Sequence, residues 1–418
     1  MQPKHGTRRA NLEYMVETKI RARAILIDME EGVIGRYRNG PFKDLFDDKF
    51  IITNSPGSGN NWAEGYYTHG RKFKNNILNV VRQVAERSDN LQGFIFMLST
   101  GGGTGSGLGT YCLRLLEDNY PSVDRFVSCV YPIGSEDVIT CPYNMALSTK
   151  QLIDHASCVF PAENRALTEM IAVEAKRKGP HNEKAGFFAE NTTFENMNSI
   201  IVNSLLHLTC GSRFSGALNM DMSDISTNLV PFPNMHFLSS GITPIFTPMK
   251  KAIFKIKPKL KEEMFHSIRS KSNQLIKINP VGPTSVLLSA ALQTRGDVNN
   301  SDLRKFVEKL QSKGNFTTWS RKAVKVGHCA VAPQNCQVAM MSLFNTTTMS
   351  ELFSHINLSF KRLYNRKAHI HHYTQTSGFE SDYFQECSET LLNMIEMYKQ
   401  TETASSNCIP RLSDTSPV

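Results

Sequence analysis

The feature that most constrains this chain is the glycine-rich segment at residues 99–107, where five of the seven positions from 101 to 107 are glycine. The apolar run at 93–98 before it has the composition of a buried parallel strand. Apolar residues after it follow helical spacing, as Leu108, Tyr111, Cys112, Leu115 and Leu116. The segment therefore predicts a tight turn between the end of a strand and the start of a helix.

A turn of this kind suits a phosphate group. Glycines permit positive φ and allow the backbone to approach a ligand closely. Successive amides then point into one concavity, and the helix N-terminus adds partial positive charge. The hydroxyls of Thr104 and Ser106 add two donors. We predict phosphate contacts from Gly101, Gly102, Gly103, Thr104, Gly105, Ser106 and Gly107.

The glycines match neither of two well-known phosphate-binding motifs. A P-loop ends in Gly-Lys-Ser/Thr, whereas Leu108 and Gly109 follow Gly107 here. The dinucleotide fingerprint Gly-x-Gly-x-x-Gly fails because Ser106 stands where the third glycine belongs. A turn without a ligand would account for a lone Gly-x-Gly, but not for five glycines at a strand-to-helix junction.

The pattern along the chain predicts an α/β fold. Strand-like runs at 22–28, 93–98 and 125–131 alternate with helical spacing, as in a parallel sheet covered by helices. Later segments predict strands at 285–291 and 337–343, with a helix near 301–310 between them. Long helices are expected at 350–363 and 388–399. Residues 176–190 read as an exposed loop, and residues 401–418 as a disordered tail.

Composition narrows the function classes. The 418 residues are 40% hydrophobic and 20% charged, as in a folded globular protein. No apolar run reaches the roughly 20 residues of a membrane helix, so we expect no membrane contact. The nine cysteines form no Cys-x-x-Cys pair, which favours a reduced chain. Much of the net charge of +9 lies in 250–261 and 361–367. Neither stretch interleaves aromatic residues in the manner of a base-stacking surface, so we expect a solvated or protein-facing basic face rather than a nucleic-acid site.

Several motifs resemble the tubulin family, in the family's order and over most of the chain. Gly-Gly-Gly-Thr-Gly-Ser-Gly at 101–107 matches the family signature. Further similar stretches are Gly-Ser-Gly-Asn-Asn-Trp-Ala at 57–63, Pro-Tyr-Asn at 142–144, Val-Pro-Phe-Pro at 230–233 and His-His-Tyr at 371–373. The segments at 26–33 and 368–373 are most similar to the epsilon branch. The delta branch shares the 57–63 stretch and is the nearest competitor.

The resemblance implies a GTP site. Asn60 would lie in the loop that faces the γ-phosphate, and Asp28 and Glu30 would hold Mg²⁺. Asp137 lies in the ribose loop. Asn164 would bond guanine or ribose, Asn198 would read the guanine edge and Phe194 would stack on the base. Taken alone, both asparagines are equally explained as helix caps or surface polar residues.

The resemblance also implies hydrolysis completed in trans, by an acid that one subunit offers to its neighbour's nucleotide. Asp224, with Asp221 three residues earlier, occupies the matching loop at 216–224. A carboxylate there would orient the attacking water. First-turn acids that stabilise a helix N-terminus explain the same residues, and both interpretations stay open.

Two departures weaken the expected site. The family's glutamate before Pro-Tyr-Asn is Cys141 here. The family begins with a strand and a Gly-Gln-Cys-Gly-Asn-Gln loop, whereas this sequence reaches Asp28 almost at once. We therefore expect exposed apolar sheet and weak or absent GTP binding.

These observations lead to an expected organisation and function. We expect a GTP-binding domain at 1–212 that includes a central helix at 194–211, an α+β intermediate domain at 213–345, and C-terminal helices at 346–400. The resemblance implies a cytoskeletal protein of centrioles, centrosomes and basal bodies that assembles with alpha-, beta- or delta-tubulin and organises microtubules. The alternative is a centrosomal adaptor that neither polymerises nor binds GTP strongly. A dinucleotide-dependent oxidoreductase is a third, weaker alternative.

Overall fold

The computed structural model describes residues 21–132, 138–177, 193–245, 258–334 and 336–406. They form two compact units. The first comprises the described residues up to Ser58 and Lys72–Asn90, and the second comprises Gly59–Arg71 and the residues from Leu91 onward. Asp137, most of the predicted loop at 176–190 and most of the basic stretch at 250–261 lie outside the described residues.

The first unit contains a small parallel sheet. Strand β1 (Leu26–Asp28) pairs with β2 (Ile51–Thr53), so β1 keeps only the last three residues of the strand predicted at 22–28. The other elements of this unit are α2 (Glu31–Asn39), the short turn η1 (Asp48–Phe50) and most of α3 (Gly70–Ala85). Apolar residues recur at helical spacing along α3, and Ile77, Val80 and Val81 among them are buried.

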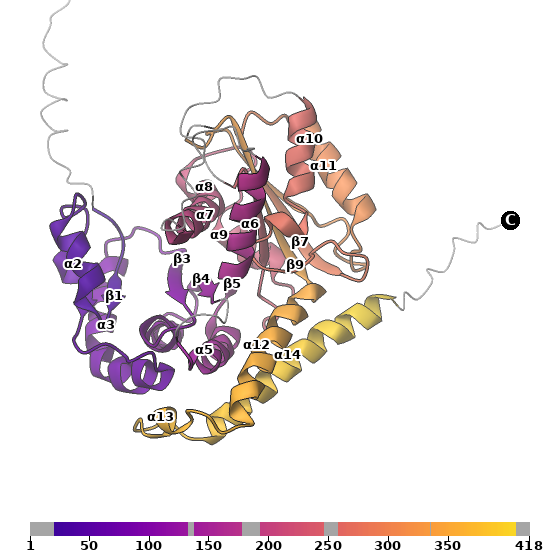
Figure 1. The fold of residues 1–418 in the computed structure, drawn as a ribbon. Coiled ribbons are helices and arrows are strands. Elements are labelled where there is room, and N and C mark those ends of the chain that lie inside the picture. Colours follow the sequence, from indigo (N-terminus) through magenta and orange to yellow (C-terminus); the bar gives the residue numbers. More distant parts are fainter. Residues whose placement is uncertain (1–20, 133–137, 178–192, 246–257, 335, 407–418) are drawn as a thin grey trace, which may run out of the picture. The chain divides into compact units, whose positions relative to one another are not determined.

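The second unit begins with a parallel sheet in the order β3–β4–β5 (Figure 1). Its strands are β3 (Gly93–Ser99), β4 (Asp124–Tyr131) and β5 (Cys158–Glu163). Helices alternate with them, as α4 (Gly109–Asn119), α5 (Cys141–His155) and α6 (Asn164–Arg177). This alternation confirms the α/β fold that the sequence predicts.

Strand β3 lies at one edge of this sheet. Within the described residues its only strand partner is β4. Two apolar side chains on one face of β3 are unusually accessible, Ile95 at 45% and Met97 at 73%. Apolar sheet surface is therefore exposed at β3.

A second, mixed sheet has the order β6–β9–β7–β8. Its strands are β6 (Ser239–Thr243), β7 (Leu287–Gly296), β8 (Lys325–Cys329) and β9 (Val338–Thr346). Only β7 and β8 run parallel to each other. Every residue of the central strands β7 and β9 is buried, as in a sheet covered on both faces. Helices α10 (Pro258–Ser267) and α11 (Asn300–Lys313) pack beside it, and Phe265 stacks on Phe306 with ring centroids 4.6 Å apart.

Two long C-terminal helices lie side by side, with a short helix at the turn between them (Figure 1). They are α12 (Ser350–Tyr364), α13 (His371–Thr374) and α14 (Asp382–Ser406). Tyr143 of α5 packs against Phe360 at 5.6 Å and Phe384 at 5.0 Å between ring centroids. Helix α14 begins before the predicted 388–399, and its buried residues start at Phe384 and continue to Tyr398. The helix also includes residues 401–406, which were expected in the tail.

The helix predicted at 194–211 is divided in two. Helix α7 (Thr193–Leu208) ends before Thr209, and α8 (Cys210–Arg213) follows. The remaining elements are α9 (Met222–Leu229), the short π-helices η2 (Glu64–His69) and η3 (Thr104–Leu108), and the short 3-10 helices η6 (Lys271–Asn273) and η7 (Thr347–Met349). Among the described helices, none combines the length and apolar character needed to cross a membrane.

The buried His207 of α7 predicts a loss of stability in acid. Its Nδ1–H donates to the Asn203 carbonyl at 2.8 Å, and burial, with Arg295 and Arg213 adding to it, lowers the pKa of His207 to about 4. In the unfolded chain the group titrates near 6.5, so its contribution to stability is present above pH 6.5 and is lost as pH falls toward 4. We expect the unfolding free energy of wild type to fall by about 2 kcal/mol more than that of His207→Met between pH 7 and pH 5.

Urea denaturation at the two pH values measures this difference. His266→Asn is the control, because His266 is exposed on α10. Equal pH dependence of wild type and His207→Met would contradict the prediction.

Candidate functional site

The predicted phosphate and base residues follow the carboxyl ends of neighbouring parallel strands. The glycine segment follows β3, the loop with Asp137 follows β4, and Asn164 begins α6 directly after β5. Register pairs Ser99 with Val130 and Tyr131 with Glu163, so these ends lie along one edge of the sheet. Ligands of open α/β sheets bind at this edge.

The glycine turn is anchored to β4 and leads into a helix. The Thr100 amide and its Oγ1 both donate to the Val130 carbonyl, at 3.0 and 3.1 Å. The chain then forms η3 and continues as α4. Ser106 is fully buried and its hydroxyl donates to the Gly102 carbonyl. Ser106 therefore braces the turn from inside, whereas the sequence predicted that its hydroxyl bonds a phosphate.

The turn fits a phosphate group by two observations. No described residue accepts a hydrogen bond from the backbone N–H of Gly102 or Gly103. A Cβ built on Gly102 would have only Asn60 Oδ1 nearby, at 3.7 Å, so the approach to this backbone is open. Backbone amides that have no acceptor within the described part of the chain, next to the start of a helix, are the donors that an anion needs.

Asn60 lies next to this turn. Gly59 and Asn60 both adopt the left-handed conformation, with φ of 54° and 53°, which asparagine tolerates better than most side chains. The Asn60 carbonyl accepts from the Thr140 hydroxyl at 3.1 Å and from Asn144 Nδ2 at 2.8 Å. The same Nδ2 donates to the Gly101 carbonyl at 2.8 Å. Asn144 thus brings together the two loops that were expected to face the phosphates.

The predicted base-binding residues lie on two adjacent helices. Thr168 of α6 contacts Met197 of α7, with Oγ1 and Sδ 3.7 Å apart, one turn from the start of each helix. Asn164 begins α6, and Phe194 and Asn198 flank Met197 on α7. Phe194 is 73% exposed and Asn198 is also exposed, so both are accessible to a ligand.

Cys141 supplies no carboxylate to the site. The residue is buried at the start of α5, and a Cβ on Gly101 would stand 3.2 Å from its sulfur. The thiol packs under the glycine turn as a small apolar group.

The predicted magnesium ligands lie in the first unit. Asp28 ends β1, and Glu30 precedes α2 as its N-cap. Partial burial raises the pKa of Asp28, and the nearby charge of Glu30 raises it further. Hydrogen bonds from the Glu30 and Met29 amides act in the opposite direction, but the net effect is a raised pKa. Two carboxylates that repel each other suit a divalent cation, which relieves the repulsion. No cluster of three or more acidic, histidine or cysteine ligands occurs among the described residues.

The predicted trans-acting acids cap a helix. Asp221 Oδ1 accepts from the Asp224 amide at 2.8 Å, and Asp224 Oδ2 accepts from the Asp221 amide at 3.3 Å, so the two form a capping box on α9. Asp224 Oδ1 also forms an ion pair with Lys325 Nζ at 2.7 Å. The capping interpretation is confirmed, and both Asp224 oxygens have partners within the chain.

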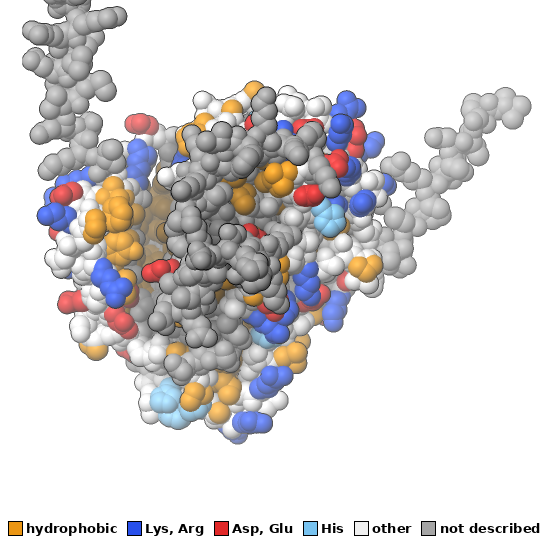
Figure 2. Space-filling view, turned by 45° about the horizontal axis from the view of Figure 1, so that its top comes forward, with side chains coloured by type: hydrophobic (Ala, Val, Ile, Leu, Met, Phe, Trp, Pro, Cys, Tyr) orange, Lys and Arg blue, Asp and Glu red, His pale blue; other side chains and the backbone are white. Residues whose placement is uncertain are grey.

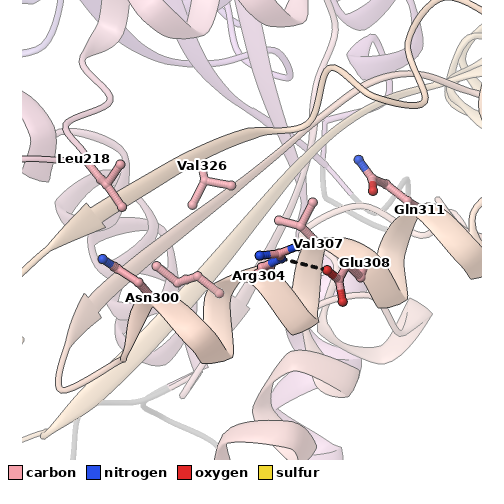
Figure 3. A pocket seen from close by; sticks show the side chains of 8 residues that line it. Leu218, Asn300, Arg304, Val307, Glu308, Gln311 and Val326 are labelled. Atoms are coloured by element: carbon pink, nitrogen blue, oxygen red, sulfur yellow. Dashed lines mark hydrogen bonds and ion pairs between the residues drawn. The ribbon is translucent and has the colours of Figure 1, made fainter.

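A cavity of about 380 Å³ opens beside the same loop (Figure 3). Leu218 from the loop and Val326 from β8 face Val307 on α11, and Arg304 bonds Glu308 along that helix at 3.0 Å. Leu218 is 41% exposed. The cavity forms a groove whose lining includes no residue of the glycine turn, so it is separate from the predicted phosphate site.

These features define an α/β protein with a glycine-rich turn at a strand-to-helix junction. Residues 4–172 match the GTPase domain of the Tubulin/FtsZ family, and residues 233–358 match the tubulin C-terminal domain. The chain is 40% identical to the tubulin epsilon chain of Homo sapiens over 411 residues, which cover 94% of this chain and 86% of that protein. It is 31% identical to the tubulin beta-1 chain of Geotrichum candidum over 388 residues, 91% of this chain and 82% of that one. The chain therefore belongs to the tubulin family, and its predicted resemblance to the epsilon branch is confirmed.

Sequence reasoning missed the residue that connects the two loops. Asn144 was recognised only as part of Pro-Tyr-Asn, and its partner Tyr373 only as part of His-His-Tyr. One signal was present, since an asparagine within a helix as apolar as α5 needs partners if it is buried.

Proposed function

We propose that this chain is a GTP-binding cytoskeletal protein that acts by assembling with other tubulins, at centrioles, centrosomes and basal bodies. The observation that carries the proposal is the glycine turn at the carboxyl edge of the parallel sheet, where the Gly102 and Gly103 amides have no acceptor among the described residues and the backbone at Gly102 can be approached. In this proposal, residues 101–107 and Asn60 hold the phosphates, and Asn164, Asn198 and Phe194 hold the guanosine. Asp137 contributes to the ribose loop.

Mg²⁺ is the second proposed ligand. Asp28 and Glu30, both in the first unit, are the residues that would hold it. The repulsion between the Asp28 and Glu30 carboxylates supports this role, because a bound divalent cation relieves it.

Hydrolysis in trans remains part of the proposal with one condition. Asp224 is paired with Lys325 and caps α9, so it must exchange these partners before it can orient a water for a neighbour's nucleotide. A role in assembly without turnover requires no such exchange.

GTP binding tests the proposal, with Gly102→Ala as the informative variant. Because a Cβ at Gly102 meets only ordinary contacts, we expect unfolding to be unchanged. The methyl group would stand in the path of the phosphate, so we expect the affinity for GTP to fall about tenfold, roughly 1.4 kcal/mol. Titration calorimetry measures the affinity. Gly109→Ala is the matched control, because its Cβ would meet the end of the Leu98 side chain at 3.4 Å.

A second candidate function is a centrosomal adaptor that neither polymerises nor binds GTP strongly. The buried Cys141, which leaves no carboxylate at the end of the ribose loop, favours it. Folded wild-type protein without saturable GTP binding would support the adaptor. Saturable binding that Gly102→Ala weakens would support the first candidate.

Assembly is tested at the groove beside Leu218. A neighbouring subunit seated there would bury the apolar groove, so a charge should prevent the contact. We expect Leu218→Glu to reduce co-sedimentation with alpha/beta-tubulin polymers at least about tenfold while leaving GTP affinity unchanged. Leu358→Glu is the control, since Leu358 is 59% exposed on α12. Equal loss in both variants, or in neither, would argue against assembly through this groove.

A further inference from the structure

The turn between α12 and α14 is bonded to the base of the phosphate loops. Tyr143 donates its hydroxyl to the Ala368 carbonyl at 2.8 Å, and Asn61 Nδ2 donates to the His372 carbonyl at 2.8 Å. The Tyr373 hydroxyl donates to Asn144 Oδ1 at 2.7 Å and lies 3.4 Å from the Thr140 carbonyl. The turn is thus fastened at three points, far from it in sequence, that all border the loops.

Asn144 uses every hydrogen-bonding position of its amide. Its Nδ2 group donates to the carbonyls of Asn60 and Gly101, both at 2.8 Å. Its Oδ1 accepts from the Trp62 amide at 3.0 Å and from Tyr373. The partners fix the orientation of the amide, because the two carbonyls accept only and the Trp62 amide donates only. The side chain is completely buried, so no water replaces a lost partner easily.

Tyr373 is the one partner of Asn144 that comes from the C-terminal helices. It is fully buried, and burial raises the pKa of its hydroxyl far above the usual value, so the group stays a donor. Its ring packs against Tyr143 at 5.5 Å, Phe379 at 5.9 Å and Phe384 at 5.5 Å between centroids. The ring therefore belongs to the core, while its single polar atom is directed at the loops.

We infer that Tyr373 is a positioning residue for nucleoside polyphosphates: through Asn144 it fixes the Gly101 and Asn60 carbonyls, and with them the loops that receive the phosphate groups. The inference rests on the proposed function, since it assigns phosphates to these loops. Tyr373 lies 229 positions after Asn144 in the sequence, and through Asn144 it sets the geometry of the glycine turn.

Tyr373→Phe separates this role from packing. The variant keeps the ring and removes only the oxygen, which leaves Asn144 Oδ1 with one donor and frees the amide to tilt. Tyr398→Phe is the matched control, because Tyr398 is equally buried on α14 and its hydroxyl has no hydrogen-bond partner among the described residues. Affinities for GTP and for guanosine are measured by competition titration. Hydrogen–deuterium exchange of peptides from residues 99–109 is measured without nucleotide.

We expect Tyr373→Phe to weaken GTP binding roughly three- to tenfold, the effect of one buried hydrogen bond, with guanosine affinity within about twofold of wild type. Exchange in residues 99–109 should be faster than in Tyr398→Phe. Equal losses for GTP and guanosine, or unchanged exchange in the glycine turn, would overturn the inference. If wild type binds no GTP, the proposed function fails, and the exchange comparison alone still decides whether Tyr373 orders the turn.

Discussion

Replacing Gly107 by alanine is expected to destabilise the protein by about 3 kcal/mol or more. A Cβ at this position would overlap the Trp62 carbonyl and stand 2.9 Å from the Tyr66 amide nitrogen. Both neighbours are backbone atoms, one of Trp62 and one of Tyr66. The Trp62 side chain is fully buried and stacks with the rings of Tyr66 and Tyr383. Neither can move without separating η2 from η3, so the added methyl group cannot be accommodated by a rotamer change.

Chemical denaturation followed by circular dichroism measures this loss. Gly102→Ala lies in the same turn and should unfold as wild type does, because its Cβ meets no backbone atom within 4 Å. The two variants thus separate two roles of glycine in this turn: Gly107 is needed for packing, and Gly102 is needed for access of a ligand. Similar stability of both variants would contradict the assignment.

The second large effect is expected from Asn144→Ala. Removing the amide leaves the Gly101 and Asn60 carbonyls, the Trp62 amide and the Tyr373 hydroxyl without this partner in a buried place. An unsatisfied buried polar group costs roughly 1–3 kcal/mol, and some of these groups keep a second bond, so we expect a total of about 3–5 kcal/mol.

Denaturation of Asn144→Ala is compared with that of Asn228→Ala. Asn228 is exposed on α9 and its amide bonds only its own helix, at the Asp224 carbonyl. We expect at most about 0.5 kcal/mol for this control. A loss of less than about 1 kcal/mol in Asn144→Ala would show that the loops do not depend on the amide.

The sequence predicts the local elements of the glycine turn well. Strand β3 and helix α4 both follow from short-range patterns, namely an apolar run and apolar residues at helical spacing. Helix α11 is predicted at 301–310 and observed at Asn300–Lys313 for the same reason. Helix α14 is less well predicted, because Phe384 is buried against residues distant in sequence, namely Tyr143 of α5 and Phe360 of α12, and periodicity near the helix start does not reveal these contacts.

The direction of individual side chains is what the sequence does not predict. Ser106 and Thr104 look equivalent as donors in the motif, yet the Ser106 hydroxyl turns inward to Gly102. Asp224 of α9 looks available in sequence, but it forms an ion pair with Lys325, which strand β8 supplies from a distant part of the chain. The roles of Asn60, Asn164, Phe194 and Asn198 still rest on the family resemblance, although the fold brings their elements to one edge.

The turn at 368–373 has an inner and an outer surface. Its inner side bonds Asn61, Tyr143 and Asn144, while His371 and His372 are exposed on its outer side, and histidine side chains are visible at this end of the second unit (Figure 2). If binding at the outer surface is coupled to nucleotide binding at the loops on the inner side, thermodynamic linkage makes the coupling reciprocal. A protein that binds His371 and His372 and shifts Tyr373 would change the affinity of this chain for nucleotide. Bound nucleotide would change the affinity of the chain for that protein by the same factor.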